Sequence, residues 1–220
     1  GDTLLMLWGN PEANATSHSV SGSNDWSGNF SFSNFQGPPN LETAAEFHGK
    51  KNLALSAPIS AVGGGTLTYA ASGLPDGLIL NVVTGEITGA PTAGGFTQAT
   101  LTVTGQSRTG QPLTHSLTYD FKVVDLATFP LQMNLTLSGY DGNSTLTDFP
   151  TLIDFHQGLT DFTYNSFLSP TGNDLRFFDA SGKELIYEIE SWDVTGHSYV
   201  WVKVPSISGA NTVITVAWGN

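Results

Sequence analysis

Polar and apolar residues alternate along much of this chain with a period of two, the pattern of β-strands that bury one face. The alternation is clearest over Thr97–Thr104, Ser116–Val124 and Tyr199–Val204. Gly, Pro, Asn and Asp separate such runs, and the one helix-like stretch, Leu41–Phe47, is too short to form a stable helix alone. The pattern predicts an all-β chain of antiparallel sandwiches, with Pro205 closing the strand that begins at Tyr199.

The same alternation assigns faces within that strand. Val200, Val202 and Val204 share one face, and Trp201 and Lys203 share the other. Because a lysine side chain belongs in solvent, we predict that the valines point into a core. Trp201 is then expected on the polar face.

The tripeptide Trp-Gly-Asn occurs at 8–10 and again at 218–220, each time after an apolar, β-prone run. Self-similarity at a fixed spacing indicates a repeat architecture, and here the spacing is almost the whole chain. We therefore predict one unit of a longer linear array. The first run duplicates a strand that the C-terminal part already contains, so we expect it to pair with the neighbouring unit. The residues expected at this interface are Thr3, Leu4, Leu5, Met6, Leu7, Trp8 and Trp26.

Turns and linkers divide the chain into 1–36, 37–126 and 127–220, of which the first reads as the tail of a preceding sandwich. The middle segment contains the motif Tyr69–Leu80, with a Pro-containing turn between two glycines, and then Thr84–Thr92, which opens on a tight hairpin. These motifs resemble the Ig-like or cadherin-like domains of bacterial surface proteins. The resemblance implies a seven-strand sandwich that serves as a spacer in extracellular arrays.

The last segment carries a second set of motifs. In order, they are Leu146–Pro150, Asn173–Asp179, Glu188–Asp193, Val200–Pro205 and Trp218–Asn220. They resemble the family called domain of unknown function 2341, and 1–35 resembles its closing strand and the following loop. The resemblance implies a concanavalin-like jelly roll. The expected architecture is an Ig-like β-sandwich followed by a jelly-roll-like β-sandwich.

The chain is acidic: 7 Lys and Arg against 19 Asp and Glu give a formal net charge of −12. A phosphate-binding groove needs clustered cations, so nucleic acid and anionic membrane surfaces are poor partners. Cysteine is absent, which removes thiolate metal sites, and no apolar run is long enough for membrane insertion. Few charges with abundant Gly, Ser and Thr are typical of secreted β-proteins. We expect an extracellular or cell-surface location, with any targeting signal outside this segment.

Glu188 and Glu190 are two residues apart on an expected strand and so share a face, near Trp192 and Trp201. Paired carboxylates on one strand are found in glycoside hydrolases, and exposed tryptophans bind sugars. These four residues are therefore candidate ligand residues for a carbohydrate-binding or glycoside-hydrolase-like jelly roll. The alternative is that the tryptophans are half-buried in the core and the glutamates are solvated or in ion pairs.

Arg176 stands out because the last segment has so few cations. We predict a half-buried ion pair that fixes strand register, with Glu188 as partner and Asp174 or Glu190 as alternatives. Lys203 is a second cation that could pair with one of the glutamates.

The five histidines (His18, His48, His115, His156 and His197) show no metal-ligand spacing, and no cofactor motif is present. Calcium is the one ion with candidate loops, Asp141–Asn143 and Asn173–Asp174, although neither has the Asp-rich calcium pattern. Our leading hypothesis is a non-enzymatic, extracellular structural or adhesive unit that assembles head to tail with copies of itself into a filament, matrix or giant surface protein. The alternative is a carbohydrate-active jelly-roll module with glycan partners.

Overall fold

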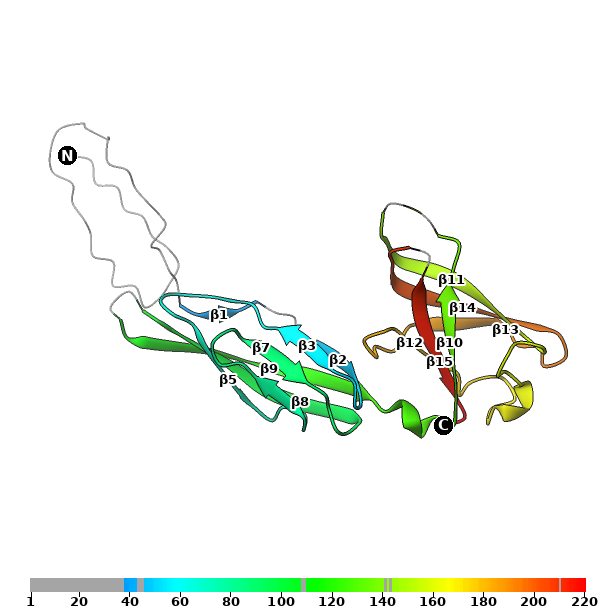
Figure 1. Cartoon of the computed structure of the whole chain (residues 1–220), viewed down its shortest axis with the longest axis horizontal. Coiled ribbons are helices and arrows are strands. Elements are labelled where there is room, and N and C mark those ends of the chain that lie inside the picture. Colours follow the sequence, from blue (N-terminus) through cyan, green and yellow to red (C-terminus); the bar gives the residue numbers. More distant parts are fainter. Residues whose placement is uncertain (1–37, 43–45, 108–109, 141, 143, 210) are drawn as a thin grey trace, which may run out of the picture. The chain divides into compact units, whose positions relative to one another are not determined.

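The computed structural model describes residues 38–220 except 43–45, 108–109, 141, 143 and 210. The expected interface residues from Thr3 to Trp8, and Trp26, lie outside the described residues. Strands form nearly all the regular structure (Figure 1), and the described helical segments are two short 3-10 helices, η2 (Leu126–Thr128) and η3 (Tyr164–Ser166). The prediction of an all-β fold is confirmed, and Leu41 and Phe47 of the helix-like stretch lie in strands.

Nine strands of the first sandwich lie in the described residues. They are β1 (Asn40–Leu41), β2 (Glu46–Lys50), β3 (Leu55–Pro58), β4 (Ala61–Val62), β5 (Thr68–Ser72), β6 (Leu78–Leu80), β7 (Glu86–Gly89), β8 (Gly95–Gln106) and β9 (Pro112–Val124). One sheet has the order β2-β9-β8-β5, a second has β3-β7-β6, and β1 pairs with β4. Buried side chains of the two larger sheets form one hydrophobic core, which makes this an Ig-like sandwich.

Two glycines make the predicted turns of this sandwich possible. Gly77 has φ +91°, and a Cβ there would lie 2.1 Å from the carbonyl oxygen of Ala90. Gly85 has φ +74° and ends the β6–β7 connection, in which the Asn81 side chain accepts hydrogen bonds from the N–H groups of Val83 and Thr84. Only glycine adopts such backbone angles without strain, so the motif fixes both chain reversals.

In the second sandwich the described residues form six strands. They are β10 (Leu131–Leu137), β11 (Leu146–His156), β12 (Arg176–Phe178), β13 (Tyr187–Ser191), β14 (His197–Ile207) and β15 (Thr212–Trp218). Its two sheets have the orders β10-β15-β12 and β11-β14-β13. The first strand therefore pairs with the last and the second with the next to last, which is the wrapped pairing of a jelly roll.

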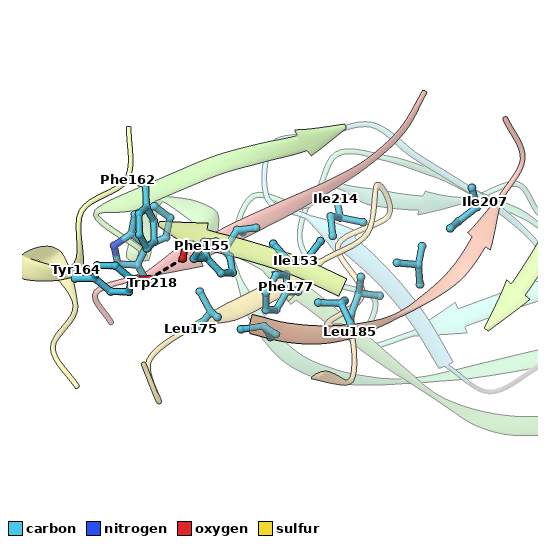
Figure 2. Close-up of a cluster of buried hydrophobic side chains, with 14 residues drawn as sticks. Ile153, Phe155, Phe162, Tyr164, Leu175, Phe177, Leu185, Ile207, Ile214 and Trp218 are labelled. Atoms are coloured by element: carbon cyan, nitrogen blue, oxygen red, sulfur yellow. Dashed lines mark hydrogen bonds between the residues drawn. The ribbon is translucent and has the colours of Figure 1, made fainter. Parts of the chain in front are cut away.

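Figure 2 shows the core of this sandwich, with Phe155, Phe162, Tyr164 and Trp218 gathered at one end. The hydroxyl of Tyr164 donates to the carbonyl oxygen of Phe155 over 2.7 Å, the bond that is dashed in the figure. The aromatic end of the core is thus both apolar and hydrogen-bonded.

The face assignment within β14 is confirmed. The exposed fractions of Val200, Val202 and Val204 are 0%, 0% and 1%, whereas that of Trp201 is 39%. The predicted end of the strand is wrong, because β14 continues through Pro205 to Ile207. The strand tolerates this proline because the opposing residue, Asp148, has φ +52° and this pair is missing from the ladder, so no donor is needed there.

Candidate functional site

Trp218 is the largest fully buried side chain in the described structure. Its ring stacks on Phe167 at a centroid distance of 5.3 Å and an interplanar angle of 9°. Its indole Nε1–H donates to Oγ of Ser166 over 2.9 Å, so the polar edge of the ring is also satisfied. Both contacts come from the loop around η3.

The next two residues have their own partners. Gly219 has φ +85° and donates its N–H to Oδ2 of Asp174 over 3.0 Å. Its missing side chain matters because a Cβ would lie 2.8 Å from Cγ of Pro130. Nδ2 of Asn220 donates to Oγ1 of Thr128 over 3.1 Å.

Each residue of the repeated tripeptide therefore occupies a defined place, which we call the Trp-Gly-Asn socket. The socket consists of Thr128, Pro130, Ser166, Phe167 and Asp174. The socket contacts the indole of Trp218, the backbone of Gly219 at positive φ and the side-chain amide of Asn220. These three contacts explain why this tripeptide is found at this place in the fold.

Asp174 organises the socket. It is buried, and its two carboxylate oxygens accept the N–H groups of Leu168 (2.9 Å), Ser169 (3.1 Å) and Gly219 (3.0 Å). Burial alone would raise the pKa of this carboxyl, but the backbone donors outweigh burial and hold the pKa below its ordinary value. The oxygens of Asp174 therefore already face three N–H groups, and the expectation of calcium at Asn173–Asp174 stays a prediction.

The other candidate calcium loop includes Asp141 and Asn143, which lie outside the described residues. Within the described ranges, no group of three or more His, Asp or Glu is placed to hold a metal ion.

The strand that carries the tripeptide is the central strand of its sheet. β15 pairs with β10 over seven residues and with β12 over three, and its last five residues are buried. A buried strand needs a partner strand on each side, because its backbone N–H and C=O groups are shielded from water and must be hydrogen-bonded. Within the described part of this sheet, the position between β10 and β12 is such a slot, and the sandwich's own β15 fills it.

The outer face of the other sheet holds part of the predicted ligand set. Glu188 is the cross-strand partner of Trp201, and Nε1 of Trp201 donates to Oε2 of Glu190 over 2.6 Å. Tyr199 lies two residues along β14 on the same face and is 37% exposed. Leu152 of β11 is the partner of Trp201 on the other side and is also exposed. We call Leu152, Glu188, Glu190, Tyr199 and Trp201 the outer strip.

Trp192 does not belong to the outer strip, which corrects the prediction. Its ring contacts Phe155, Tyr164 and Phe167 at centroid distances of 6.5, 5.4 and 5.0 Å, in the aromatic end of the core. The ladder shifts register between Ile189 and Ser191. Simple alternation therefore fails just before Trp192.

The partner of Arg176 also differs from the prediction. Nε of Arg176 lies 3.3 Å from Oε1 of Glu184, and Nη1 donates to the Tyr187 hydroxyl over 3.2 Å. Glu188 is not its partner because Tyr187 and Glu188 point to opposite faces of β13, so Arg176 meets the Tyr187 hydroxyl while Glu188 lies beside Trp201 on the outer face. Lys203 pairs with Asp148 at 3.1 Å, so neither cation pairs with a glutamate of the outer strip.

The sequence reasoning missed Tyr199 and Leu152 as members of the outer strip, and it missed every residue of the socket except Asp174. Alternation along 199–203 was sufficient to find Tyr199. His197 extends the same row, and its Nδ1 lies 2.8 Å from Oδ1 of Asp154. None of the helices in the described part of the chain has the length and apolarity that crossing a membrane requires.

Comparison with protein families agrees with both sets of motifs. Residues 38–124 match the family described as "Putative Ig domain", and residues 171–220 match "Domain of unknown function (DUF2341)". These are the two families that the sequence indicated. The second match covers only the C-terminal part of the second sandwich.

Several solved structures are similar to parts of the chain. A putative α-galactosidase/melibiase from Bacteroides fragilis shares 21% identity over 41% of this chain and 18% of that chain, with a TM-score of 0.36. A putative α-galactosidase from the same organism shares 23% identity, covering 44% of this chain and 20% of that chain, with a TM-score of 0.36. Protocadherin gamma B2 extracellular cadherin domains 3–6 share 15% identity, covering 81% of this chain and 46% of that chain, with a TM-score of 0.28. The chain thus spans less than half of each of these structures. No curated protein matches the sequence.

Proposed function

We propose that this chain is a non-enzymatic, extracellular structural and adhesive repeat unit that assembles head to tail with copies of itself into a filament, a matrix or a giant surface protein. The carrying observation is the Trp-Gly-Asn socket, which the chain's own Trp218, Gly219 and Asn220 fill. The sequence contains the same tripeptide a second time, at 8–10. The second copy then occupies the socket of a neighbouring unit by displacing that unit's own β15.

The strand before the tripeptide supports the same arrangement. Thr3–Trp8 has the apolar character of β15, which needs a partner strand on each side. Inserted between the β10 and β12 counterparts of the next unit in place of that unit's β15, it gains main-chain hydrogen bonds and a core position for Trp8. Because the donor strand and the slot are different parts of one unit, repetition gives an open head-to-tail chain. The two units can be covalently continuous or separate.

Location and chemistry follow from the same proposal. The Ig-like family match, the formal net charge of −12 and the absence of cysteine are consistent with an extracellular spacer module. Copies of the chain are the proposed partners, and no cofactor is required, because strand addition uses main-chain hydrogen bonds and apolar burial.

Removing β15 provides the sharpest test. A chain truncated after Gly209 has an empty slot, and we expect its own residues 3–10 to fill the slot of the next molecule. Size-exclusion chromatography with light scattering should then show polymers that grow with concentration. Deleting residues 1–10 from the truncated chain should leave monomers, and Trp8→Ala should weaken assembly strongly. Trp201→Ala, on the opposite sheet, is the matched tryptophan control. A truncated chain that stays monomeric, or one that polymerises without residues 1–10, contradicts the proposal.

A second candidate function is carbohydrate binding, favoured by the outer strip. Trp201 is 39% exposed and its indole N–H donates to Glu190, so the ring is held in place while part of the residue stays open to solvent. The carboxylates of Glu188 and Glu190 could accept hydrogen bonds from sugar hydroxyls, or carry out hydrolysis if suitably spaced. Glycan-array binding that Trp201→Ala and Tyr199→Ala both abolish would support binding. Hydrolysis that Glu188→Gln or Glu190→Gln abolishes would support an enzyme. Signals at background level for the unaltered chain contradict both.

A further inference from the structure

We infer that the Ig-like sandwich resists mechanical tension along the chain, because its β2–β9 pair is loaded in shear when the ends of the module are drawn apart. The resistance is a property of the module itself. Its use in holding an assembly together rests on the proposed repeat function.

The pairing of β2 with β9 is the structural basis. β2 is the edge strand of its sheet and runs parallel to β9 (Figure 1), with Glu46 opposite Asp120 and Lys50 opposite Val124. The N–H of Lys51 donates to the carbonyl oxygen of Val124 over 2.9 Å and extends the pairing by one residue. The other ladders described in this sandwich are antiparallel.

Strand direction decides how tension acts on this pair. The chain enters β2 at Glu46 and leaves β9 after Val124, so tension pulls backward along β2 and forward along β9. The hydrogen bonds between the strands are then strained together instead of breaking one after another. The upstream strand β1 has only two register pairs with β4, so we expect it to detach first without releasing β2.

Ion pairs join the two strands at both ends of the β2–β9 seam, the line along which β2 and β9 pair. Oε2 of Glu46 lies 3.1 Å from Nζ of Lys122 on β9. At the other end, Nζ of Lys51 lies 2.7 Å from Oδ2 of Asp125, the residue that follows β9. Sliding β2 along β9 breaks both pairs together with the main-chain ladder.

An aromatic side chain anchors the middle of the seam. The ring of Phe47 stacks on Phe121 at a centroid distance of 5.0 Å and on Tyr119 at 5.7 Å. Both partners belong to β9 and are fully buried. Shearing β2 therefore also pulls an aromatic ring out of the core, which adds to the resistance.

Pulling the full chain in two directions tests the inference. The chain contains no cysteine, so two introduced cysteines define the points of attachment. Glu42→Cys with Ala127→Cys loads the β2–β9 pair in shear. Leu53→Cys with Ala127→Cys pulls the same two strands from their shared end and peels them apart. In an optical trap we expect the module to unfold at a force higher in shear by about a factor of two or more, because several hydrogen bonds share the load. Equal forces in the two directions overturn the inference.

Side-chain variants then test the ends of the seam. Lys122→Met should lower the shear force and leave the peeling force nearly unchanged, because its ion pair lies at the far end from the peeling attachment. Lys51→Met should lower both forces, because its ion pair lies at the end where peeling starts. Lys183→Met, in the second sandwich, should change neither. If Lys51→Met and Lys122→Met both unfold in shear at the same force as the unaltered chain, the ion pairs do not have the proposed role. The outcome is separable from the proposed assembly. A force difference without head-to-tail assembly contradicts only the repeat function, and assembly without a force difference contradicts only this inference.

Discussion

The backbone N–H of Gly219 donates to Oδ2 of Asp174 over 3.0 Å and so joins the end of β15 to a loop residue 45 positions earlier. The same carboxylate accepts the N–H groups of Leu168 and Ser169, directly after the residues that hold Trp218. One buried charge thus ties the closing strand to the loop that forms its socket.

Replacing Asp174 should destabilise the second sandwich. In Asp174→Asn the amide directs N–H hydrogens toward N–H donors, and hydrogen bonds to a charged group are worth about 1.5–3 kcal/mol, so we expect a loss of about 2 kcal/mol. Urea unfolding followed by tryptophan fluorescence measures this loss, because the described tryptophans all lie in this sandwich. Asp161→Asn, at an exposed position, is the control. An unchanged urea midpoint for Asp174→Asn would refute the role of this carboxylate.

The lowered pKa of Asp174 predicts a pH dependence. Because the folded-state pKa lies below the unfolded one, the stabilisation is complete above the unfolded pKa and is lost as the pH falls through the folded pKa. The free energy of unfolding of the second sandwich should therefore decrease in acid, and Asp174→Asn should flatten that part of the profile. Stability curves of the two proteins that fall in parallel would show that other groups control acid unfolding.

Val202 and Trp201 should respond very differently to substitution. Val202 is fully buried, so Val202→Asp places an unpaired charge in the core at a cost of about 3–5 kcal/mol and should unfold the second sandwich. Trp201→Ala removes a half-exposed ring and should cost about 1 kcal/mol. Far-UV circular dichroism and thermal melts distinguish the two. A folded Val202→Asp variant would contradict the core assignment.

Gly77 should be intolerant of a side chain. Gly77→Ala combines φ +91° with a Cβ only 2.1 Å from the Ala90 oxygen, and we expect the Ig-like sandwich to lose about 2–4 kcal/mol. Gly110→Ala is a matched control, since Gly110 has φ +79° but open space around it. Calorimetry of the full chain should show a lower melting temperature for Gly77→Ala than for Gly110→Ala. Equal melting temperatures would mean that the backbone moves away from the Ala90 oxygen without loss of stability.

The fold was largely predictable because its signals are local. Alternation placed Val200, Val202 and Val204 in the core, and the glycine spacing around Gly77 and Gly85 placed the turns. The end of β14 was not predictable from Pro205, because the proline is tolerated only opposite Asp148, whose position depends on a strand some sixty residues earlier.

The sites were less predictable because their partners come from irregular segments. Ser166 and Phe167 reach Trp218 from a loop that has no periodicity. Trp192 turns into the core beyond a register shift that alternation does not reveal. Sequence patterns locate strands and faces, but contacts made by loops depend on the complete tertiary structure.

The pairing of β10 with β15 also affects how the second sandwich is made during synthesis. Among the strands that the structure describes, β10 is the first of this sandwich and β15 the last, and β15 is the one strand that pairs with β10. Roughly eighty residues separate them, so at the usual pace of translation β10 waits for about 4–16 seconds with an unpaired edge. Trp218 also arrives last, which leaves the aromatic end of the core unfilled until then. Until β15 emerges, the nascent sandwich is open to any strand of similar sequence that is already nearby.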